Sequence, residues 1–411
     1  MFQILSKISN SELRSKILTL ENTQIHLVFC SLNRIFATKM AGLYIHIPFC
    51  RSRCIYCGFY STTGLELRQR YVEAVCKEIS MVCKDTPIRT IYLGGGTPSQ
   101  LTIPQLQQIL NAAYIYNKVE SDAEITIECN PDDVTKDFVE GLSQLPFNRV
   151  SMGAQTFCDK RLGFIQRRHN SSQVFGAVER LRDTGIRNIS IDLMYGFPGE
   201  TISEWEKDIN DALSLGVEHL SAYCLMIEEG TPLYELRMKS DELRRSLPDE
   251  ELERQMYELL IDRLTSAGYE HYEISNFAKP GFRSRHNSSY WDGTPYIGIG
   301  AAAHSYDIRS RSWNVADIKQ YMEGIEKGNR IFEEELIDEN THYNDTVTVA
   351  LRTQKGICLD DLSERHRDYC LKNARRFIAD GLLHTNGHQL ALTRQGLFVS
   401  DMIMSELVWV D

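Results

Sequence analysis

The feature that most constrains the fold is a repeated alternation of short apolar segments and helical segments between residues 43 and 225. Each apolar segment is rich in β-branched residues, and a polar or glycine-rich turn follows it. Strands that alternate with helices predict a parallel sheet with crossover connections. The predicted strands are Leu43–Ile47, Thr90–Leu93, Glu124–Glu128, Arg149–Met152, Asn188–Leu193 and His219–Leu225. The predicted helices between them include Gln69–Met81, Pro104–Tyr114, Ser172–Asp183 and Ser203–Leu215.

Six such units can form a barrel, or a flat sheet with helices on both faces. The position of the unusual residues favours the barrel, because barrel proteins assemble their sites from the carboxyl ends of several strands. Those ends hold a cysteine-rich loop after Ile47, Gly94–Gly96, Glu128, Gln155 and Asp192. We therefore predict an α/β fold built on a partial (β/α)6 barrel.

The alternation stops after about residue 230, so the chain is expected to contain further parts. Residues 40–235 form the predicted barrel, and residues 236–335 a connecting region with one long helix at Asp249–Ala267. Residues 336–411 are predicted to form a smaller C-terminal domain, helical and similar to a winged helix, with a last helix at Leu397–Leu407. Residues 1–39 hold no usable motif and are predicted to be a dispensable extension.

Charge and apolar content exclude several classes of protein. The net charge of −11 argues against a broad nucleic-acid surface, which needs a basic field. No apolar run reaches the roughly 18 residues that a membrane-spanning helix needs. Most of the 11 cysteines are scattered singly, as is typical of reduced cysteines in a cytoplasmic protein.

The loop Cys50-Arg51-Ser52-Arg53-Cys54-Ile55-Tyr56-Cys57 is the strongest chemical signal. Four thiolates normally saturate a [4Fe–4S] cluster, and three would leave one iron open. That iron could chelate S-adenosylmethionine (SAM), and an electron from the cluster could cleave its sulfonium. The alternative is a zinc site completed by a distant ligand such as His46. Zinc loops, however, usually combine two cysteine pairs, and no second pair exists in this sequence.

Further motifs at the strand ends fit a nucleotide-like ligand. Gly94-Gly95-Gly96-Thr97-Pro98 lets the backbone approach a ligand, although a tight turn is the alternative. The Gly-Lys-Ser/Thr of a phosphate loop is absent. Glu128 could accept a hydrogen bond from a ribose hydroxyl, and Gln155, Arg167 and Asp192 could complete a polar pocket. Each of these residues alone could equally be a surface or capping residue.

Five segments together resemble the oxygen-independent coproporphyrinogen III oxidase family of radical-SAM proteins. They are Tyr44-Ile45-His46-Ile47-Pro48-Phe49-Cys50, the cysteine loop, Gly94–Ser99, Ser151–Gln155 and Ile191–Gly199. The resemblance extends to the C-terminus, where Leu392–Gly396 looks like that family's C-terminal domain. It implies a [4Fe–4S] cluster bound by Cys50, Cys54 and Cys57. The SAM pocket that it implies comprises Tyr44, Tyr56, Gly95, Gly96, Thr97, Glu128, Gln155, Arg167 and Asp192.

Two features separate the branches of this family. The oxidases have a further cysteine two residues after the third cluster cysteine, where this chain has Phe59. His286-Asn287-Ser288-Ser289-Tyr290-Trp291 resembles a motif of the heme-chaperone branch, which implies heme as a third ligand and His286 as a residue that binds it. His304 is a weaker candidate. The alternative is that the aromatic residues of this segment plug the barrel while His286 bonds a backbone carbonyl.

The resemblance implies a heme chaperone that delivers heme to respiratory apoproteins, and whether the chain is also an enzyme stays open. The alternative function is that of the oxidase, which decarboxylates porphyrinogen propionates. The expected partners are heme and recipient heme proteins, with no nucleic acid. A homodimer and peripheral membrane association through the recipient are further expectations.

Overall fold

The computed structural model describes residues 40–410, so the predicted extension at residues 1–39 lies outside the described residues. All six predicted strands are present, most of them a few residues longer than predicted. Each pairs in parallel with the next, so that chain order is also sheet order. The strands are β1 (Ala41–Ile47), β2 (Thr86–Gly95), β3 (Asn117–Cys129), β4 (Arg149–Gln155), β5 (Asn188–Tyr195) and β6 (His219–Cys224).

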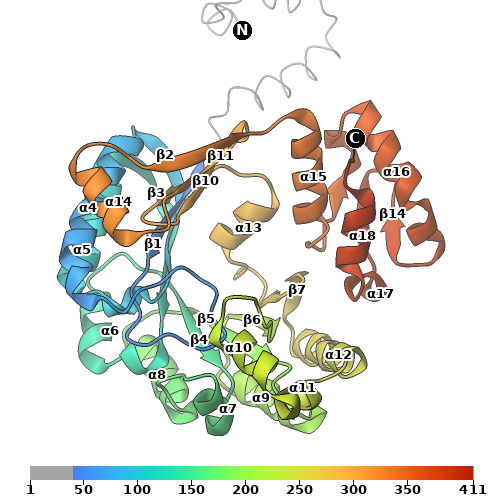
Figure 1. Ribbon diagram of the computed structural model, residues 1–411, viewed down its shortest axis with the longest axis horizontal. Helices are drawn as coiled ribbons and strands as arrows, with labels where there is room; N and C mark the ends of the chain where they lie inside the picture. The colour runs from blue at the N-terminus through green and yellow to red at the C-terminus, as the bar shows by residue number, and fades with distance from the viewer. Residues whose placement is uncertain (1–39, 411) are drawn as a thin grey trace, which may run out of the picture. The chain divides into compact units, whose positions relative to one another are not determined.

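Helices cover the outer side of this curved sheet (Figure 1). The helix α4 buries Tyr71, Val72, Val75 and Ile79, a spacing that lines one helical face with apolar side chains. Sequence also sets where the helices begin: Thr201 and Glu204 form a capping box at the start of α9. The outer helices are α4 (Arg68–Val82), α5 (Ile103–Tyr116), α6 (Lys136–Leu142), α7 (Asp159–Phe164), α8 (Ser171–Asp183) and α9 (Ile202–Ser214).

Residues 236–335 extend both edges of the sheet, which the sequence did not predict. On one edge β9 pairs in parallel with β1 and continues into an antiparallel meander, and on the other edge β8 and β7 follow β6. The resulting sheet has twelve strands, with β12 and β7 at its edges, and the predicted partial barrel is confirmed. The added strands are β7 (Glu270–Glu273), β8 (Asn276–Ala278), β9 (Tyr296–Ile299), β10 (His304–Tyr306), β11 (Ser310–Asn314) and β12 (Phe332–Leu336).

The helices of this region include the predicted long one, which begins after Asp249 and ends at Ser266. The Asp249 side chain accepts a hydrogen bond from the amide of Leu252 and so caps the helix. The helices of the region are α10 (Pro232–Lys239), α11 (Asp241–Ser246), α12 (Glu250–Ser266), α13 (Arg285–Trp291) and α14 (Ile318–Glu326).

The C-terminal part has its own apolar core and a three-stranded sheet in the order β13-β15-β14. The predicted last helix at Leu397–Leu407 is wrong in one respect, because the chain forms two helices, with Phe398 and Val399 between them. Arg394 and Asp262 form an ion pair of 2.6 Å that joins this part to α12. Its elements are α15 (Glu339–Ala350), β13 (Ile357–Cys358), α16 (Glu364–Ala379), β14 (Leu383–Thr385), β15 (Gln389–Leu392), α17 (Arg394–Leu397) and α18 (Ser400–Leu407).

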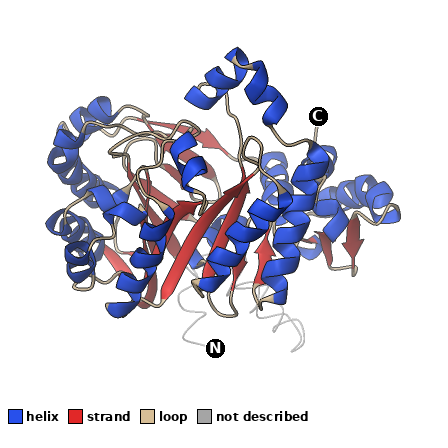
Figure 2. Cartoon of the chain, turned by 90° about the horizontal axis from the view of Figure 1, so that it is seen from below, coloured by secondary structure: helices blue, strands red, loops and turns tan. Residues whose placement is uncertain are grey.

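The main apolar core lies between the barrel strands and the helices around them. Figure 2 shows these layers, with strands in red and helices in blue. Fully buried aliphatic side chains from successive strands, such as Leu43, Ile91, Ile127 and Ile189, supply it. Among the described helices, none has the length and apolar content that crossing a membrane requires. The boundaries at residues 235 and 335 stay predictions.

Candidate functional site

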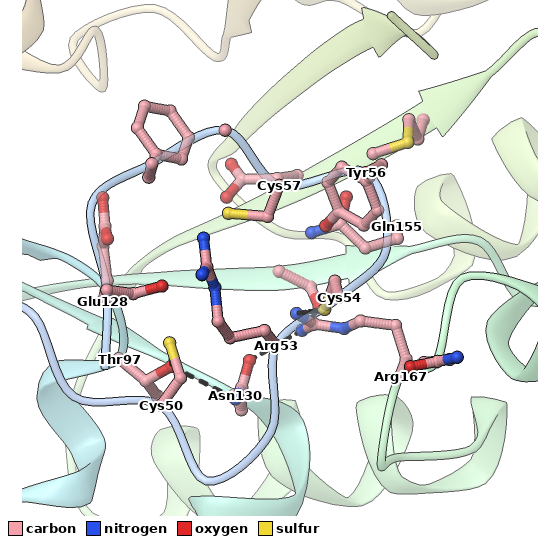
Figure 3. Close-up of a pocket in the computed structure, with 18 of the residues that line it drawn as sticks. Cys50, Arg53, Cys54, Tyr56, Cys57, Thr97, Glu128, Asn130, Gln155 and Arg167 are labelled. Atoms are coloured by element: carbon pink, nitrogen blue, oxygen red, sulfur yellow. Dashed lines mark hydrogen bonds between the residues drawn. The ribbon is translucent and has the colours of Figure 1, made fainter. Parts of the chain in front are cut away.

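A cavity of about 620 Å³ lies at the carboxyl ends of the barrel strands (Figure 3). Most of the predicted site residues line it, although they come from six separate segments of the chain. The exceptions are Tyr44 and His286. The predicted residues that line the cavity are Cys50, Cys54, Tyr56, Cys57, Gly95, Gly96, Thr97, Glu128, Gln155, Arg167 and Asp192.

The cysteine loop holds its three thiols at the cavity because the residue between them is anchored in apolar packing. Ile55 is buried in a small apolar cluster, and its carbonyl accepts a hydrogen bond of 2.9 Å from the amide of Leu233. Cys50, Cys54 and Cys57 are partly exposed free thiols. Burial raises the pKa of Cys50 and of Cys57, so metal binding there must displace protons.

A partly buried arginine lies beside these sulfurs. Arg167 donates from Nη2 to the Asn130 side chain (2.7 Å) and to the Gly153 carbonyl (2.6 Å), while its Nη1 lies 3.7 Å from the Cys54 Sγ. A fixed cation at that distance stabilises a thiolate. Three free thiols on one loop with such a donor fit the ligand set of an iron–sulfur cluster.

The zinc alternative loses the fourth ligand proposed for it. His46 is buried, its Nε2 donates to the Tyr60 carbonyl (3.0 Å), and its Nδ1 accepts from the Tyr44 hydroxyl (3.0 Å). Both ring nitrogens are therefore engaged, and the ring does not line the cavity.

The glycine loop after β2 packs directly against the strand that leads into the cysteine loop. The Gly96 amide donates to the Ile47 carbonyl (2.9 Å), and a Cβ on Gly96 would come within 2.7 Å of the Pro48 carbonyl carbon. Gly95 has a φ of +108°, which glycine adopts easily. After the glycines, Pro98–Gln100 forms a 3-10 turn, and α5 begins at Ile103.

Two carboxyl groups line the cavity, and the pKa of each is higher than that of an exposed carboxyl group. Burial raises the pKa of Glu128 to about 7 and that of Asp192 to about 6. Glu128 accepts hydrogen bonds from the Tyr92 hydroxyl (2.7 Å) and the Gly95 amide (3.1 Å), which favour its charged form. Both groups can change charge near neutral pH.

Gln155 enters the cavity through an unusual backbone conformation. Its φ is +66°, and the register between β4 and β5 shifts at this point. A non-glycine residue in the left-handed region costs energy, and such residues gather at functional sites. The bulge therefore supports the prediction that Gln155 belongs to the pocket.

Comparison with known proteins places this architecture in a family. The radical SAM superfamily model matches residues 44–212, and the HemN C-terminal domain model matches residues 337–399. The chain is 36% identical over 375 residues to the heme chaperone HemW of Bacillus subtilis, a match that covers 89% of this chain and 98% of that protein. The HemW of Lactococcus lactis is 33% identical, with 91% and 98% covered. The chain belongs to the HemW family of heme chaperones.

Among solved structures, coproporphyrinogen III oxidase (HemN) of Escherichia coli has a similar fold. It aligns with a TM-score of 0.79 at 22% identity and covers 93% of each chain. At that identity the likeness supports the fold of this HemW-family chain and leaves its activity open.

His286, which the HemW-like motif suggests as a heme ligand, lies away from the cavity. It is 1% exposed, its Nδ1 pairs with the Thr90 hydroxyl (2.8 Å) and its Nε2 with the Tyr290 hydroxyl (2.9 Å). The amides of Arg285 and His286 donate to the Glu124 carboxylate, at the amino end of the barrel part of β3. In this structure both ring nitrogens of His286 are therefore engaged and the ring does not line the cavity, and its role in heme binding stays a prediction. The structure is closer to the alternative in which this segment fills the barrel, except that His286 bonds two hydroxyl groups and no backbone carbonyl.

Tyr44 also lies inside the barrel and outside the cavity. Its ring stacks near those of Tyr92 and His286, with ring centres 6.2 and 6.3 Å away. Its hydroxyl bonds His46, so Tyr44 supports the strand that leads into the cysteine loop. His304, the weaker candidate, is exposed on β10, stacks near Trp313 at 5.9 Å, and does not line the cavity.

The structure also adds residues that the sequence analysis missed. Arg149 is 1% exposed, and its Nε and Nη1 donate to no group of the described residues. Its charge nevertheless lowers the pKa of both Glu128 and Asp192. Asn130, Tyr223 and Met226 line the cavity as well. Only their positions after β3 and within and after β6 could have indicated them, because none lies in a motif.

Proposed function

We propose that this chain is a heme chaperone that binds a [4Fe–4S] cluster, SAM and heme, and delivers the heme to respiratory heme proteins. The main support is one observation: three free thiols of a single loop line one cavity together with the polar residues of five other segments. The HemW relatives, named as heme chaperones, extend this from a cluster site to heme.

The residues have distinct proposed roles. Cys50, Cys54 and Cys57 bind the cluster, which supplies an open iron for SAM and an electron that can cleave it. The backbone around Gly95 and Gly96 leaves room for the amino-acid part of SAM. The remaining polar residues of the cavity bind the rest of SAM: Tyr56, Thr97, Glu128, Gln155, Arg167 and Asp192.

Glu128 and Asp192 suit that task because a carboxylate accepts hydrogen bonds from two ribose hydroxyls and attracts a cationic ligand. Arg167 holds the Cys54 side of the loop through its contacts to Asn130 and Gly153. Met226, Tyr223 and Phe59 lie outside this set, although they line the same cavity. We propose that the protein works in the cytoplasm, with recipients at the membrane, and that it can form a homodimer.

The direct test is heme transfer. Cluster-reconstituted protein is loaded with one equivalent of heme under anaerobic conditions and mixed with a heme-free recipient, and the Soret band of the recipient is followed. We expect transfer that is faster than from a non-specific heme carrier at the same concentration. A protein that binds no stoichiometric heme would contradict the proposal.

The same preparation tests the oxidase alternative. Phe59 is 70% exposed where the resemblance places a cysteine in the oxidases. An aromatic ring cannot supply the acid–base or radical chemistry of a thiol. We therefore expect no carbon dioxide from coproporphyrinogen in the presence of SAM and a reductant. Steady turnover would instead establish the oxidase function.

A further inference from the structure

The cavity has an apolar outer part that cluster and SAM binding leaves unexplained. Three large side chains line it and remain exposed: Phe59 at 70%, Tyr223 at 45% and Met226 at 67%. Soluble proteins seldom gather exposed apolar side chains around a cavity unless they bind a ligand there. This outer part fits a flat apolar molecule.

The two segments that supply these side chains are in direct contact. Phe59 follows Gly58 in the cysteine loop, and a Cβ on Gly58 would collide with the carboxylate of Glu228. The amide of Leu233 bonds the Ile55 carbonyl of the same loop. The cysteine loop and the segment after β6 therefore form two neighbouring walls of one opening.

One side chain in this opening can bind heme iron. Proteins hold heme iron through His, Met, Cys or Tyr, and no histidine lines the cavity among the described residues. Cys50, Cys54 and Cys57 are assigned to the cluster, and Tyr56 to SAM. Tyr223 can bind iron only as a phenolate, which burial disfavours because it raises the pKa of the phenol. The Cys224 sulfur faces the backbone, since a Cβ on Gly196 would lie 2.9 Å from it, and Met194 is only 6% exposed.

Met226 is what remains, an exposed thioether that needs no deprotonation to bind a metal. Charge points to the same ligand. Arg53 is exposed, and Figure 3 shows its side chain directed into the cavity beside Cys57. No acidic side chain of the described residues forms an ion pair with it, whereas Arg168 pairs with Asp132 and Asp133 at 3.0 Å. A flat apolar ligand that carries carboxylate groups could contact the arginine, the aromatic rings and the thioether of this opening.

We propose that heme binds at the mouth of this cavity, between Phe59 and the Tyr223–Met226 segment, with the Met226 sulfur on the iron and Arg53 on a propionate. This inference rests on the proposed function. It places the heme beside the cluster cysteines and on the far side of the barrel from His286. Delivery then needs no opening of the barrel, because the heme is bound at an exposed rim.

The test is an anaerobic heme titration of the full chain with its cluster reconstituted, for wild type and Met226→Leu. Leucine keeps the volume and removes the sulfur. We expect Met226→Leu to lose the sulfur-to-iron charge-transfer band of ferric heme and to bind heme about tenfold more weakly. Arg53→Gln should weaken binding about threefold and keep the band. Met238→Leu is the matched control, a methionine 54% exposed on α10 that does not line the cavity.

The possible failures are distinguishable. Heme that binds Met226→Leu with unchanged affinity and spectrum overturns the site and leaves the chaperone function intact. A wild-type protein that binds no heme overturns the proposed function and this site with it. Equal effects of Met226→Leu and Met238→Leu would also overturn the site, since they would show a general loss of heme affinity.

Discussion

The two ends of the barrel hold similar kinds of residue, but those at one end line a cavity and those at the other are hydrogen-bonded to each other. At the carboxyl end, thiols, carboxylic acids and a methionine line a cavity and keep part of their surface exposed. At the amino end, His286, Tyr290 and Glu124 are joined in hydrogen bonds. Both ends have sequence motifs that suggest a ligand, but the polar residues of the carboxyl end line a cavity, whereas both ring nitrogens of His286 at the amino end already have partners.

This difference shows that free hydrogen-bonding capacity in a cavity distinguishes a ligand site from a structural motif. A buried histidine whose two nitrogens both have partners stabilises the fold, because exposing it would break those bonds and leave the partners unpaired. A carboxyl group in a cavity with a raised pKa can still gain a partner from a ligand. The following predictions test this distinction, starting with the largest effect.

Removing one cluster thiol should abolish the cluster. We expect Cys54→Ala to lose the broad visible absorbance of a [4Fe–4S] centre, because two protein thiolates do not hold the cube. Iron and sulfide analysis of anaerobically reconstituted protein measures it. Cys358→Ala, which changes a cysteine of the C-terminal part, is the control and should keep full iron content. Full iron in Cys54→Ala would show that the carboxyl-end ligands are wrongly assigned.

Removing His286 should damage stability and spare ligand binding. His286→Ala leaves the Thr90 and Tyr290 hydroxyls unpaired in a buried site, and we expect a loss of about 3 kcal/mol in the free energy of unfolding. Urea denaturation of the wild type and the variant measures it. The folded variant should bind heme with the stoichiometry of the wild type. A variant with unchanged stability that binds no heme would show that His286 is a ligand residue and not a structural one.

SAM affinity should rise with pH. Glu128, with a pKa of about 7, and Asp192, with a pKa of about 6, bind SAM more tightly when ionised, because a carboxylate accepts stronger hydrogen bonds and attracts the sulfonium. Below these values protons compete with the ligand, so affinity should increase about tenfold between pH 5 and 8 and then level off. Equilibrium binding across this range measures it. Glu128→Gln should lose the upper step of the profile, and a flat wild-type profile would argue against both assignments.

The smallest effect concerns Arg149, whose charge lowers the pKa of both acids from inside the barrel. Arg149→Met should shift the SAM profile about one pH unit higher and leave affinity at high pH nearly unchanged. Arg149→Lys keeps the charge and should restore most of the profile. An equal loss of affinity at every pH would mean that Arg149 acts through packing alone.

Most of the barrel could be predicted from the sequence because its strands are long, apolar and separated by amphipathic helices. The strands at its edges could not, because they have three to five residues and lack periodicity. β12, for example, has the sequence Phe-Glu-Glu-Glu-Leu and is exposed along its whole length. Such a strand forms because β11 offers it backbone partners, and those partners lie 18 to 26 residues away along the chain.

The cavity itself was largely predictable, since residues at the ends of parallel strands must meet at one edge. Two candidates lie outside the cavity, and both have residue types that fit two roles. Tyr44 lies on β1 before the mouth that begins beyond the strand's end, and His286 lies on α13 beside the amino end of β3. Met226 and Arg149 gave no signal, because a single methionine or arginine is uninformative until the fold places it.

The most direct test of the central claim is the electron paramagnetic resonance spectrum of the reduced cluster, recorded with and without SAM in the wild type and in His286→Ala. If the three cysteines at the carboxyl end hold a cluster with an open iron, SAM should change the spectrum in both proteins. A wild-type spectrum that SAM leaves unchanged would contradict the claim.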